Sequence, residues 1–210
     1  MNNSKFSIVE AFKFAWQTFI SNPKVFLIYI SVLTILAYIF NFFVDKSLNT
    51  EDAVISGIFL LAEILIFSAI HILLTKTSLD LYDKSKILLP SISSFPLVWL
   101  KYNVGVFIYL LIFMTGTVLF LVPGIYFGVK YQFVLFPIVE KNKGILEGFK
   151  ISNQLTKGSM WKLVGFLILE SILTIGSPIL APFIIPQVAF IFTTLASTYV
   201  YRQLQAHQTA

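Results

Sequence analysis

Long apolar runs separated by short polar stretches are the dominant pattern along the chain. The six runs are Val25–Val44, Val54–Leu74, Val98–Phe120, Ile125–Val139, Trp161–Ile175 and Phe183–Tyr201. A helix needs about 20 apolar residues to cross a bilayer, with a range of roughly 17–25, and the first, second, third and sixth runs meet this requirement. The pattern therefore predicts an all-α membrane protein with six hydrophobic membrane segments arranged as three hairpins.

The fourth and fifth runs are shorter than a full span, and the turns beside them carry no charge. The turn before the fourth run contains Pro123 and Gly124, and prolines 178, 182 and 186 follow or end the fifth. Proline-broken backbone at membrane depth must be covered by protein or line a wet cavity. We expect both turns to stay inside the outer leaflet, with Pro123 and Gly124 forming the hairpin turn.

The positive charges are distributed unevenly between the two ends of the apolar runs. Most of the 15 Lys and Arg residues lie before the first run, between the second and third, between the fourth and fifth, or in the tail at Arg202. The stretch between the first and second runs holds only Lys46, beside three acidic residues. Because cytoplasmic loops carry an excess of Lys and Arg, we expect both termini in the cytoplasm.

Two similar polar-apolar segments precede the first and fifth runs. Residues 8–13 read IVEAFK, and residues 145–150 read ILEGFK. Ser7 and Glu10 have the spacing of a capping box, which begins a helix, and Gly158 is placed for a helix C-terminal cap. The pattern predicts amphipathic helices in the membrane interface before segments one and five. The predicted lipid-surface contacts are Lys13, Trp16, Lys150, Lys157 and Trp161.

A weaker third lead-in precedes the third run, at Ser91–Lys101. The chain, a single integral membrane domain over residues 1–210, then divides into repeat units 7–76, 90–140 and 144–204. Internal repeats are common in transporters, although these three units share one predicted orientation. Two explanations stay open, namely true duplication and convergence of lead-in helices that membrane entry demands.

Composition narrows the classes of function. The chain is 57% hydrophobic and 12% charged and has no Cys, whereas soluble domains average about 25% charged residues. Without Cys there is no disulfide, thiolate zinc site or thiol nucleophile. The net charge of +5 lies beside apolar segments, which indicates anionic lipid head groups rather than nucleic acid as partners. No nucleotide loop, nucleophile elbow or metal-ligand spacing occurs, so we predict no enzyme activity and no cofactor.

Three charged residues lie inside the apolar segments, namely Glu63, Lys130 and Glu170. A charge at a helix centre costs roughly 2.5–3.5 kcal/mol on insertion scales, so it faces the bundle interior and finds a partner. We expect Lys130 to pair with Glu63 or Glu170. Such a cluster binds a proton or cation, locks hairpins together, or contains a protonated glutamate that donates a hydrogen bond.

The stretch from Leu121 to Leu167 carries a family resemblance. The residues of the pattern are Pro123-Gly124-Ile125, Phe136-Pro137, Glu140-Lys141, Glu147, Ser152, Leu155, Thr156, Gly158 and Trp161. The pattern resembles an uncharacterised bacterial polytopic inner-membrane family related to the glycerophosphoryl diester phosphodiesterase membrane domain. This resemblance implies a multi-pass protein of the bacterial cytoplasmic (inner) membrane. It implies no activity, because the phosphodiesterase barrel alone needs about 250 residues.

Three functions are consistent with these patterns. The leading hypothesis is a non-enzymatic inner-membrane protein with a lipid-facing or scaffolding role, with a protein partner or a second copy of the chain as a further contact. The alternative is a small transporter or channel that uses Glu63, Lys130 and Glu170. The third, a membrane-bound enzyme acting on lipids, would need a polar cluster at head-group depth. The charges near Asp80 and Asp83 are better explained as a solvated loop.

Overall fold

The computed structural model describes residues 5–48, 53–84, 87, 93–180 and 184–209. All of its regular structure is helical, in agreement with the predicted all-α class. The helices are α1 (Ile8–Ser21), α2 (Pro23–Leu48), α3 (Ala53–Tyr82), α4 (Phe95–Leu119), α5 (Leu121–Tyr131), α6 (Leu135–Lys141), α7 (Ile145–Thr156), α8 (Met160–Leu180) and α9 (Ile185–Thr209).

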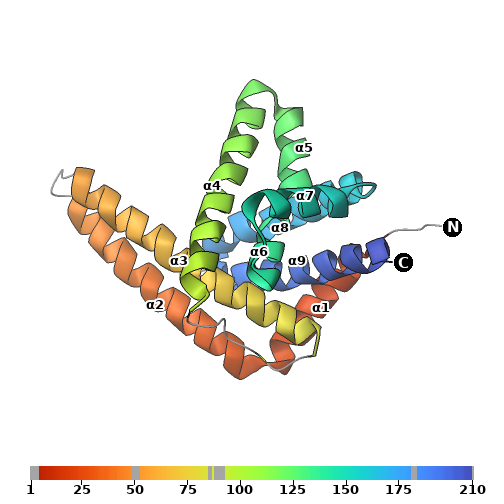
Figure 1. Ribbon diagram of the computed structural model, residues 1–210. Helices are drawn as coiled ribbons and strands as arrows, with labels where there is room; N and C mark the ends of the chain where they lie inside the picture. Colours follow the sequence, from red (N-terminus) through yellow and green to blue (C-terminus); the bar gives the residue numbers. More distant parts are fainter. Residues whose placement is uncertain (1–4, 49–52, 85–86, 88–92, 181–183, 210) are drawn as a thin grey trace.

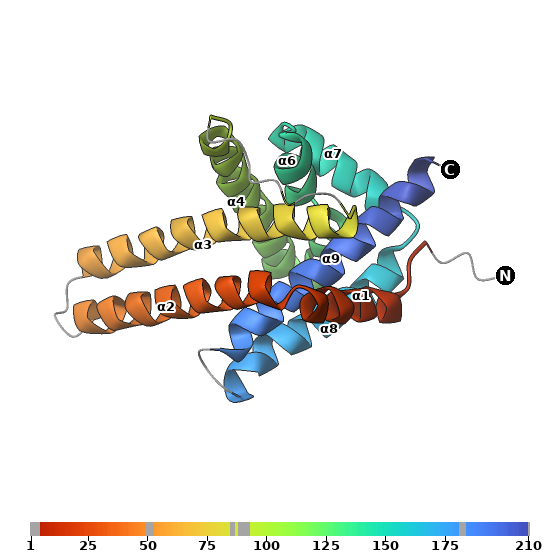
Figure 2. The ribbon, with the colours of Figure 1, turned by 90° about the horizontal axis from the view of Figure 1, so that it is seen from below.

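Helix α9 is the centre of the fold. It packs against α1, α2, α3, α7 and α8, and Figures 1 and 2 show it crossing the middle of the molecule beside α1. Ile191, Leu195 and Val200 on α9 are fully buried. These three side chains are therefore covered by protein.

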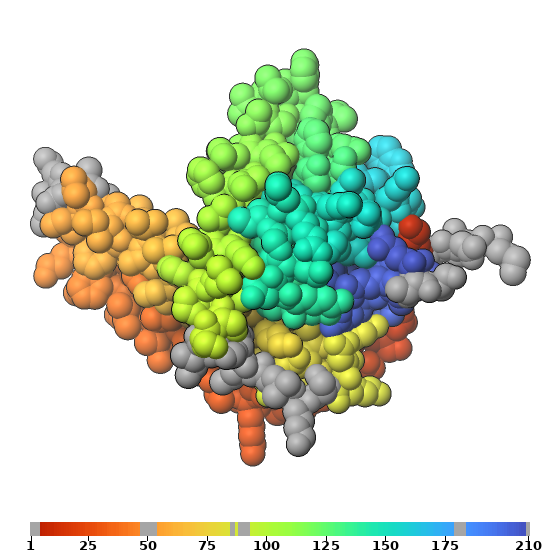
Figure 3. All heavy atoms as spheres, in the orientation of Figure 1, coloured from red at the N-terminus to blue at the C-terminus, as the bar shows by residue number. Residues whose placement is uncertain are grey.

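Two helical hairpins project from this central body in different directions. Helices α2 and α3 extend to one side, whereas α4 and α5 extend upward in Figure 1, and the space-filling view in Figure 3 shows both projections. Large apolar side chains remain exposed along both hairpins, among them Ile28, Ile58, Phe107 and Val122. An exposed apolar surface of this extent is typical of a chain whose solvent is a bilayer.

Within the described residues, five stretches are long and apolar enough to cross a membrane. They are Pro23–Lys46, Val54–Tyr82, Phe95–Leu119, Leu121–Lys141 and Met160–Pro178. The first five predicted segments are thus found, and the fifth is longer than expected because α8 continues through Pro178. The predicted six-segment layout is not shown.

The predicted sixth segment, Phe183–Tyr201, corresponds to α9, apart from Phe183, which lies outside the described residues. Helix α9 is not among the five candidate spans. Its sequence is interrupted by polar side chains, and Gln187, Thr194 and Thr198 are buried within the protein. The polar side chains of α9 are tolerated because other helices cover them, and not because the helix surface is uniformly apolar.

The turn between α4 and α5 lies at Phe120, and not at Pro123 and Gly124 as predicted. Phe120 adopts an extended backbone and donates its N–H to the carbonyl of Gly116 at 3.0 Å. Pro123 and Gly124 instead lie in the first turn of α5. Proline is tolerated there because the first N–H groups of a helix have no intrahelical partner.

The predicted fourth run, Ile125–Val139, is divided between α5 and α6 by a break that the sequence did not predict. Helix α5 ends at Tyr131 and α6 begins at Leu135, which frees backbone groups in between. Ser152 of α7 accepts a hydrogen bond from the Phe133 N–H at 3.2 Å and donates to the Lys130 carbonyl at 2.9 Å. Thr156 Oγ1 lies 3.3 Å from the same carbonyl. The Ser-x-x-Leu-Thr motif therefore satisfies the backbone at the break.

Gly124 is required where α5 crosses α4. A Cβ atom at this position would lie 2.2 Å from Thr117 Oγ1 and 2.7 Å from Thr117 Cα. We predict that Gly124→Ala lowers the free energy of unfolding by about 1–3 kcal/mol, the usual cost of overpacking. Thermal unfolding of the detergent-solubilised protein measures this change.

Gly57 provides a matched control, because a Cβ there meets nothing within 4 Å. Gly57→Ala on α3 is expected to leave stability unchanged or to raise it by up to about 1 kcal/mol, since alanine is the better helix former. Equal effects of the two substitutions would contradict the close crossing of α4 and α5.

Candidate functional site

A pocket lined by both polar and apolar side chains lies between the helices, with a volume of about 390 Å³, and it is open on the α8 side, where Ser171 and Thr174 are exposed. Four parts of the chain contribute to its wall: α3, the α5–α6 break with α6, α8 and α9. The lining residues are His71, Thr75, Gln132, Leu135, Phe136, Glu170, Ser171, Thr174, Ile175, Phe190, Thr193, Thr194 and Ser197. Hydroxyl, amide, imidazole and carboxyl groups thus meet between candidate membrane spans, where polar side chains are rare.

Glu170 is the one predicted site residue that lines this pocket. Its position in the middle of α8 places it opposite α9, and Ser197 of α9 donates a hydrogen bond to Glu170 Oε1 at 2.6 Å. This short bond to a carboxyl oxygen joins the two helices across the pocket.

Most hydroxyl groups in the wall use their protons on their own helix. Ser171 and Thr174 of α8 donate to the carbonyls of Leu167 and Glu170 at 2.8 and 2.9 Å. Thr194 of α9 donates to the Phe190 carbonyl at 2.8 Å. A hydroxyl group whose one proton is already donated can only accept further hydrogen bonds. These oxygens therefore offer acceptor lone pairs to a ligand in the pocket.

The amide and imidazole groups of the wall are held differently. His71 Nδ1 is hydrogen-bonded to the Tyr102 hydroxyl, and its ring centroid lies 4.9 Å from that of Phe190. Gln132 follows the end of α5, and its buried side-chain nitrogen has no hydrogen-bond partner among the described residues. A buried amide without a partner requires an explanation, and here it lies at the pocket.

The structure does not bring the three predicted charges together. Lys130 Nζ lies 3.4 Å from the Tyr126 hydroxyl and 5.1 Å from the Tyr126 ring centroid, and among the described residues no ion pair joins it to Glu63 or Glu170. Glu63 is half-buried on α3 and does not line the pocket. The ion pair expected for Lys130 is replaced by a cation–π contact with tyrosine.

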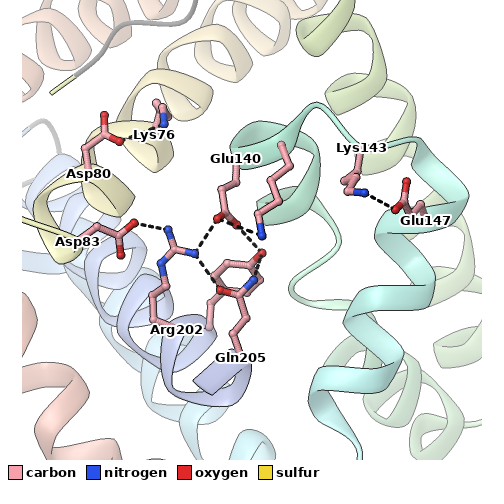
Figure 4. A network of polar contacts seen from close by, with 10 residues as sticks. Lys76, Asp80, Asp83, Glu140, Lys143, Glu147, Arg202 and Gln205 are labelled. Carbon is pink, nitrogen blue, oxygen red and sulfur yellow. Dashed lines mark hydrogen bonds and ion pairs between the residues drawn. The ribbon is translucent and has the colours of Figure 1, made fainter. Parts of the chain in front are cut away.

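A second polar site lies at the ends of α3, α6 and α9, and Figure 4 shows it from close by. Arg202 donates to Glu140 Oε1 at 2.8 Å and to Asp83 Oδ2 at 2.5 Å. Tyr201 donates to the other Glu140 oxygen at 2.8 Å. Burial by itself lowers the pKa of Arg202, but the Glu140 and Asp83 carboxylates outweigh it and raise the pKa above its usual value. The guanidinium thus stays charged and ties three helices together.

Sequence reasoning missed this network and misplaced Asp80, which is buried on α3 and forms an ion pair with Lys76 at 3.0 Å. Asp83 does lie in an exposed turn after α3, but its carboxylate bonds to Arg202. The available signal was the single Arg of the chain, because Arg is the cation best suited to several carboxylates at once. A long separation in sequence hid its partners.

The predicted lipid-surface contacts lie on exposed parts of the molecule. Trp16 and Trp161 are 58% and 90% exposed, and Lys13, Lys150 and Lys157 are also exposed. The Ser7 side chain accepts from the Glu10 N–H at 3.3 Å, as the capping box requires on one side. Gly158 follows α7 with φ +81, which confirms its role after the helix end.

The two similar lead-in segments occupy matching environments. Ala11 of α1 and Gly148 of α7 are both buried, whereas Val9 and Leu146 are 73% and 83% exposed. Of the proposed third lead-in, residues 91 and 92 lie outside the described residues, and Trp99 and Lys101 lie within α4 itself. The repeat-unit interpretation remains a prediction.

Comparisons of the chain with protein families, curated proteins and solved structures gave no match. The family resemblance therefore rests on the motif residues alone. Among the described residues, no group of three or more His, Cys, Asp or Glu side chains could hold a metal ion.

Arg202 is expected to stabilise the fold more than any ion pair on the surface. We predict that Arg202→Ala lowers the free energy of unfolding by about 3 kcal/mol, because the largely buried Glu140 carboxylate loses its nearest cation at 2.8 Å and keeps only the Tyr201 hydrogen bond and the more distant Lys141 among the contacts described. The double variant with Glu140→Gln should recover part of this loss. Thermal unfolding in detergent measures both changes.

Lys143→Ala is the matched control, since Lys143 forms an exposed ion pair with Glu147 at 2.6 Å in the same region (Figure 4). Exposed pairs contribute little, so stability should hardly change. A loss in Lys143→Ala as large as that in Arg202→Ala would contradict the structural importance of the Arg202 network.

Proposed function

We propose that this chain is a non-enzymatic, multi-pass protein of the bacterial cytoplasmic membrane that holds its surface helices against anionic lipid head groups. The observation that carries the proposal is the exposed face of α1. Val9, Lys13, Trp16 and Ile20 are all exposed and follow one another at helical spacing along a single stripe. A stripe that combines apolar and aromatic side chains with a lysine is typical of an interfacial helix.

The opposite face of α1 packs against the rest of the protein. Ala11 and Ala15 are fully buried, and α1 packs closely on α9. The exposed stripe is therefore held at a fixed place, so a membrane can bind it without ordering a mobile helix.

Helix α7 and the start of α8 support the same proposal. Leu146 and Trp161 are among the most exposed large apolar side chains, and Lys150 and Lys157 lie exposed beside them. Each lysine near an anionic membrane surface contributes about 1 kcal/mol of attraction. In this arrangement both termini lie in the cytoplasm and the apolar hairpins enter the bilayer. The resemblance to the phosphodiesterase-associated membrane domain is consistent with it.

Tryptophan fluorescence tests the lipid contact directly. In variants that retain a single tryptophan, with the other two replaced by Phe, we expect brominated lipids to quench Trp16 and Trp161 strongly. Trp99 is the internal control and should be quenched less, because its indole N–H donates a hydrogen bond to Ser68 Oγ at 2.9 Å between α3 and α4. Quenching of Trp16 by aqueous iodide but not by brominated lipid would refute the interfacial position of α1.

Removing the exposed lysines tests whether the surface helices bind anionic lipids. Lys13→Gln combined with Lys150→Gln should reduce the phosphatidylglycerol retained by the purified protein, as counted by native mass spectrometry. Lys46→Gln, on the predicted outer side, is the control that removes one lysine charge instead of two, and it should leave this count unchanged. Equal retention in all three proteins would exclude an anionic lipid surface at α1 and α7.

The predicted orientation can be tested with single cysteines, because the chain has none of its own. On intact cells, a membrane-impermeant maleimide should label Lys46→Cys and leave Asn153→Cys unlabelled until the membrane is opened. Both positions are exposed on the protein, so a difference in labelling reports the side of the membrane on which each cysteine lies. Labelling of Asn153→Cys in intact cells would contradict the predicted orientation.

A second candidate function is a small transporter or channel, and the pocket at Glu170 favours it. A carboxyl group with hydroxyl neighbours between candidate spans is typical of a pathway or binding site for a polar solute. Glu63 and Lys130 lie outside this pocket, so this version retains Glu170 alone of the three charges.

A further inference from the structure

We propose that the pocket between α3, α6, α8 and α9 binds a small primary organic ammonium ion. The ammonium group would lie between the Glu170 carboxyl and the hydroxyl oxygens of α8 and α9, with its carbon chain against Phe136 and Phe190. This binding site does not depend on the proposed lipid contact of α1 and α7, because the two regions share no residues.

The charge of the wall favours a cation. Among the described lining residues, Glu170 is the only acidic one and none is a lysine or an arginine. The single basic candidate, His71, already shares its Nδ1 with Tyr102. A carboxylate that stays ionised beside membrane helices is stabilised by a positive partner, and His71 is the one basic side chain among the described lining residues.

The hydrogen-bonding groups of the wall favour a ligand that donates hydrogen bonds. The hydroxyl protons of Ser171, Thr174 and Thr194 are directed to carbonyls of their own helices, and that of Ser197 is directed to Glu170. What remains on these groups is a set of oxygen lone pairs. A primary ammonium group has three N–H donors, which matches this surface better than an anion or a neutral acceptor.

The size and the apolar part of the pocket favour an organic cation over a metal ion. A volume of about 390 Å³ falls within the range of roughly 300–1,000 Å³ that is usual for small-molecule sites, and far exceeds what a bare ion needs. Phe136 and Phe190 contribute aromatic surface to the wall, which attracts organic cations and covers a short carbon chain.

Gln132 adds a group that a ligand can engage. Its buried side-chain nitrogen has no partner among the described residues, and Gln132 lines the same pocket. A ligand that brings an acceptor as well as its ammonium group, for example an amine with a hydroxyl, would satisfy this amide.

Thermal unfolding of the purified protein in detergent tests the inference with two isomeric cations. Butylammonium and tetramethylammonium have the same formula and charge, but only butylammonium can donate hydrogen bonds. A ligand that binds the folded state alone stabilises it in proportion to the logarithm of its concentration over Kd. We expect butylammonium to raise the unfolding temperature, with tetramethylammonium and sodium chloride giving no comparable shift.

The variants connect this response to the pocket. Glu170→Gln keeps the shape of the side chain and removes its charge, so we expect butylammonium to bind about tenfold more weakly or not at all. Glu63→Gln is the matched control, because it removes the same charge from a position of α3 that does not line the pocket. Its response should equal that of the unchanged protein.

Three results would overturn the inference. The first is no stabilisation of the unchanged protein by butylammonium, and the second is equal stabilisation by tetramethylammonium or sodium. The third is an undiminished response in Glu170→Gln. The first two comparisons use the unchanged protein alone, so they remain decisive even if Glu170→Gln fails to fold. Thr174→Val then provides a second variant that removes an acceptor oxygen and keeps Glu170, with weaker butylammonium binding expected and an unchanged response counting against the site.

Discussion

The arrangement of the bundle depends on how the break between α5 and α6 is satisfied. Backbone groups that are freed inside an apolar environment must find partners within the protein. Here Ser152 bonds to both sides of the break, at the Phe133 N–H and the Lys130 carbonyl. Gly148 lets α7 come close enough, since a Cβ there would lie 2.8 Å from the Val134 carbonyl oxygen. Because the break is held in this way, Gln132 lies at the pocket and α6 carries Glu140 to Arg202.

Helix α9 shows why a central helix of a membrane protein need not be uniformly apolar. Its first half provides Thr193, Thr194 and Ser197 to the pocket, and its second half provides Tyr201 and Arg202 to the charged network. On the same helix, fully buried Leu195 and Val200 pack into the core. The surrounding helices shield these polar groups, so hydropathy alone underestimates how deeply the helix is embedded in the protein.

Sequence patterns were sufficient for the helical class and for most helix positions, because long apolar runs determine where helices lie. They also located the lead-in helices and the Gly158 cap, which follow from local chemistry, whereas the break between α5 and α6 was not predicted. The turn at Phe120 was misplaced, since Pro123 and Gly124 serve in the first turn of α5 and at a helix crossing. The partners of Glu170 and Arg202 could not be predicted, because Ser197, Glu140 and Asp83 become neighbours only through tertiary packing.

The two polar sites are joined by one rigid element. Ser197 and Arg202 lie on the same uninterrupted helix, so a movement of α9 along its axis changes the Glu170 contact and the Glu140–Asp83 contacts together. Arg202 is held by two carboxylates, Glu140 and Asp83, whereas at the pocket Ser197 makes one hydrogen bond to Glu170. The Arg202 network therefore contributes the ion pairs that hold the register of α9, and the helix carries that register to the Glu170 contact.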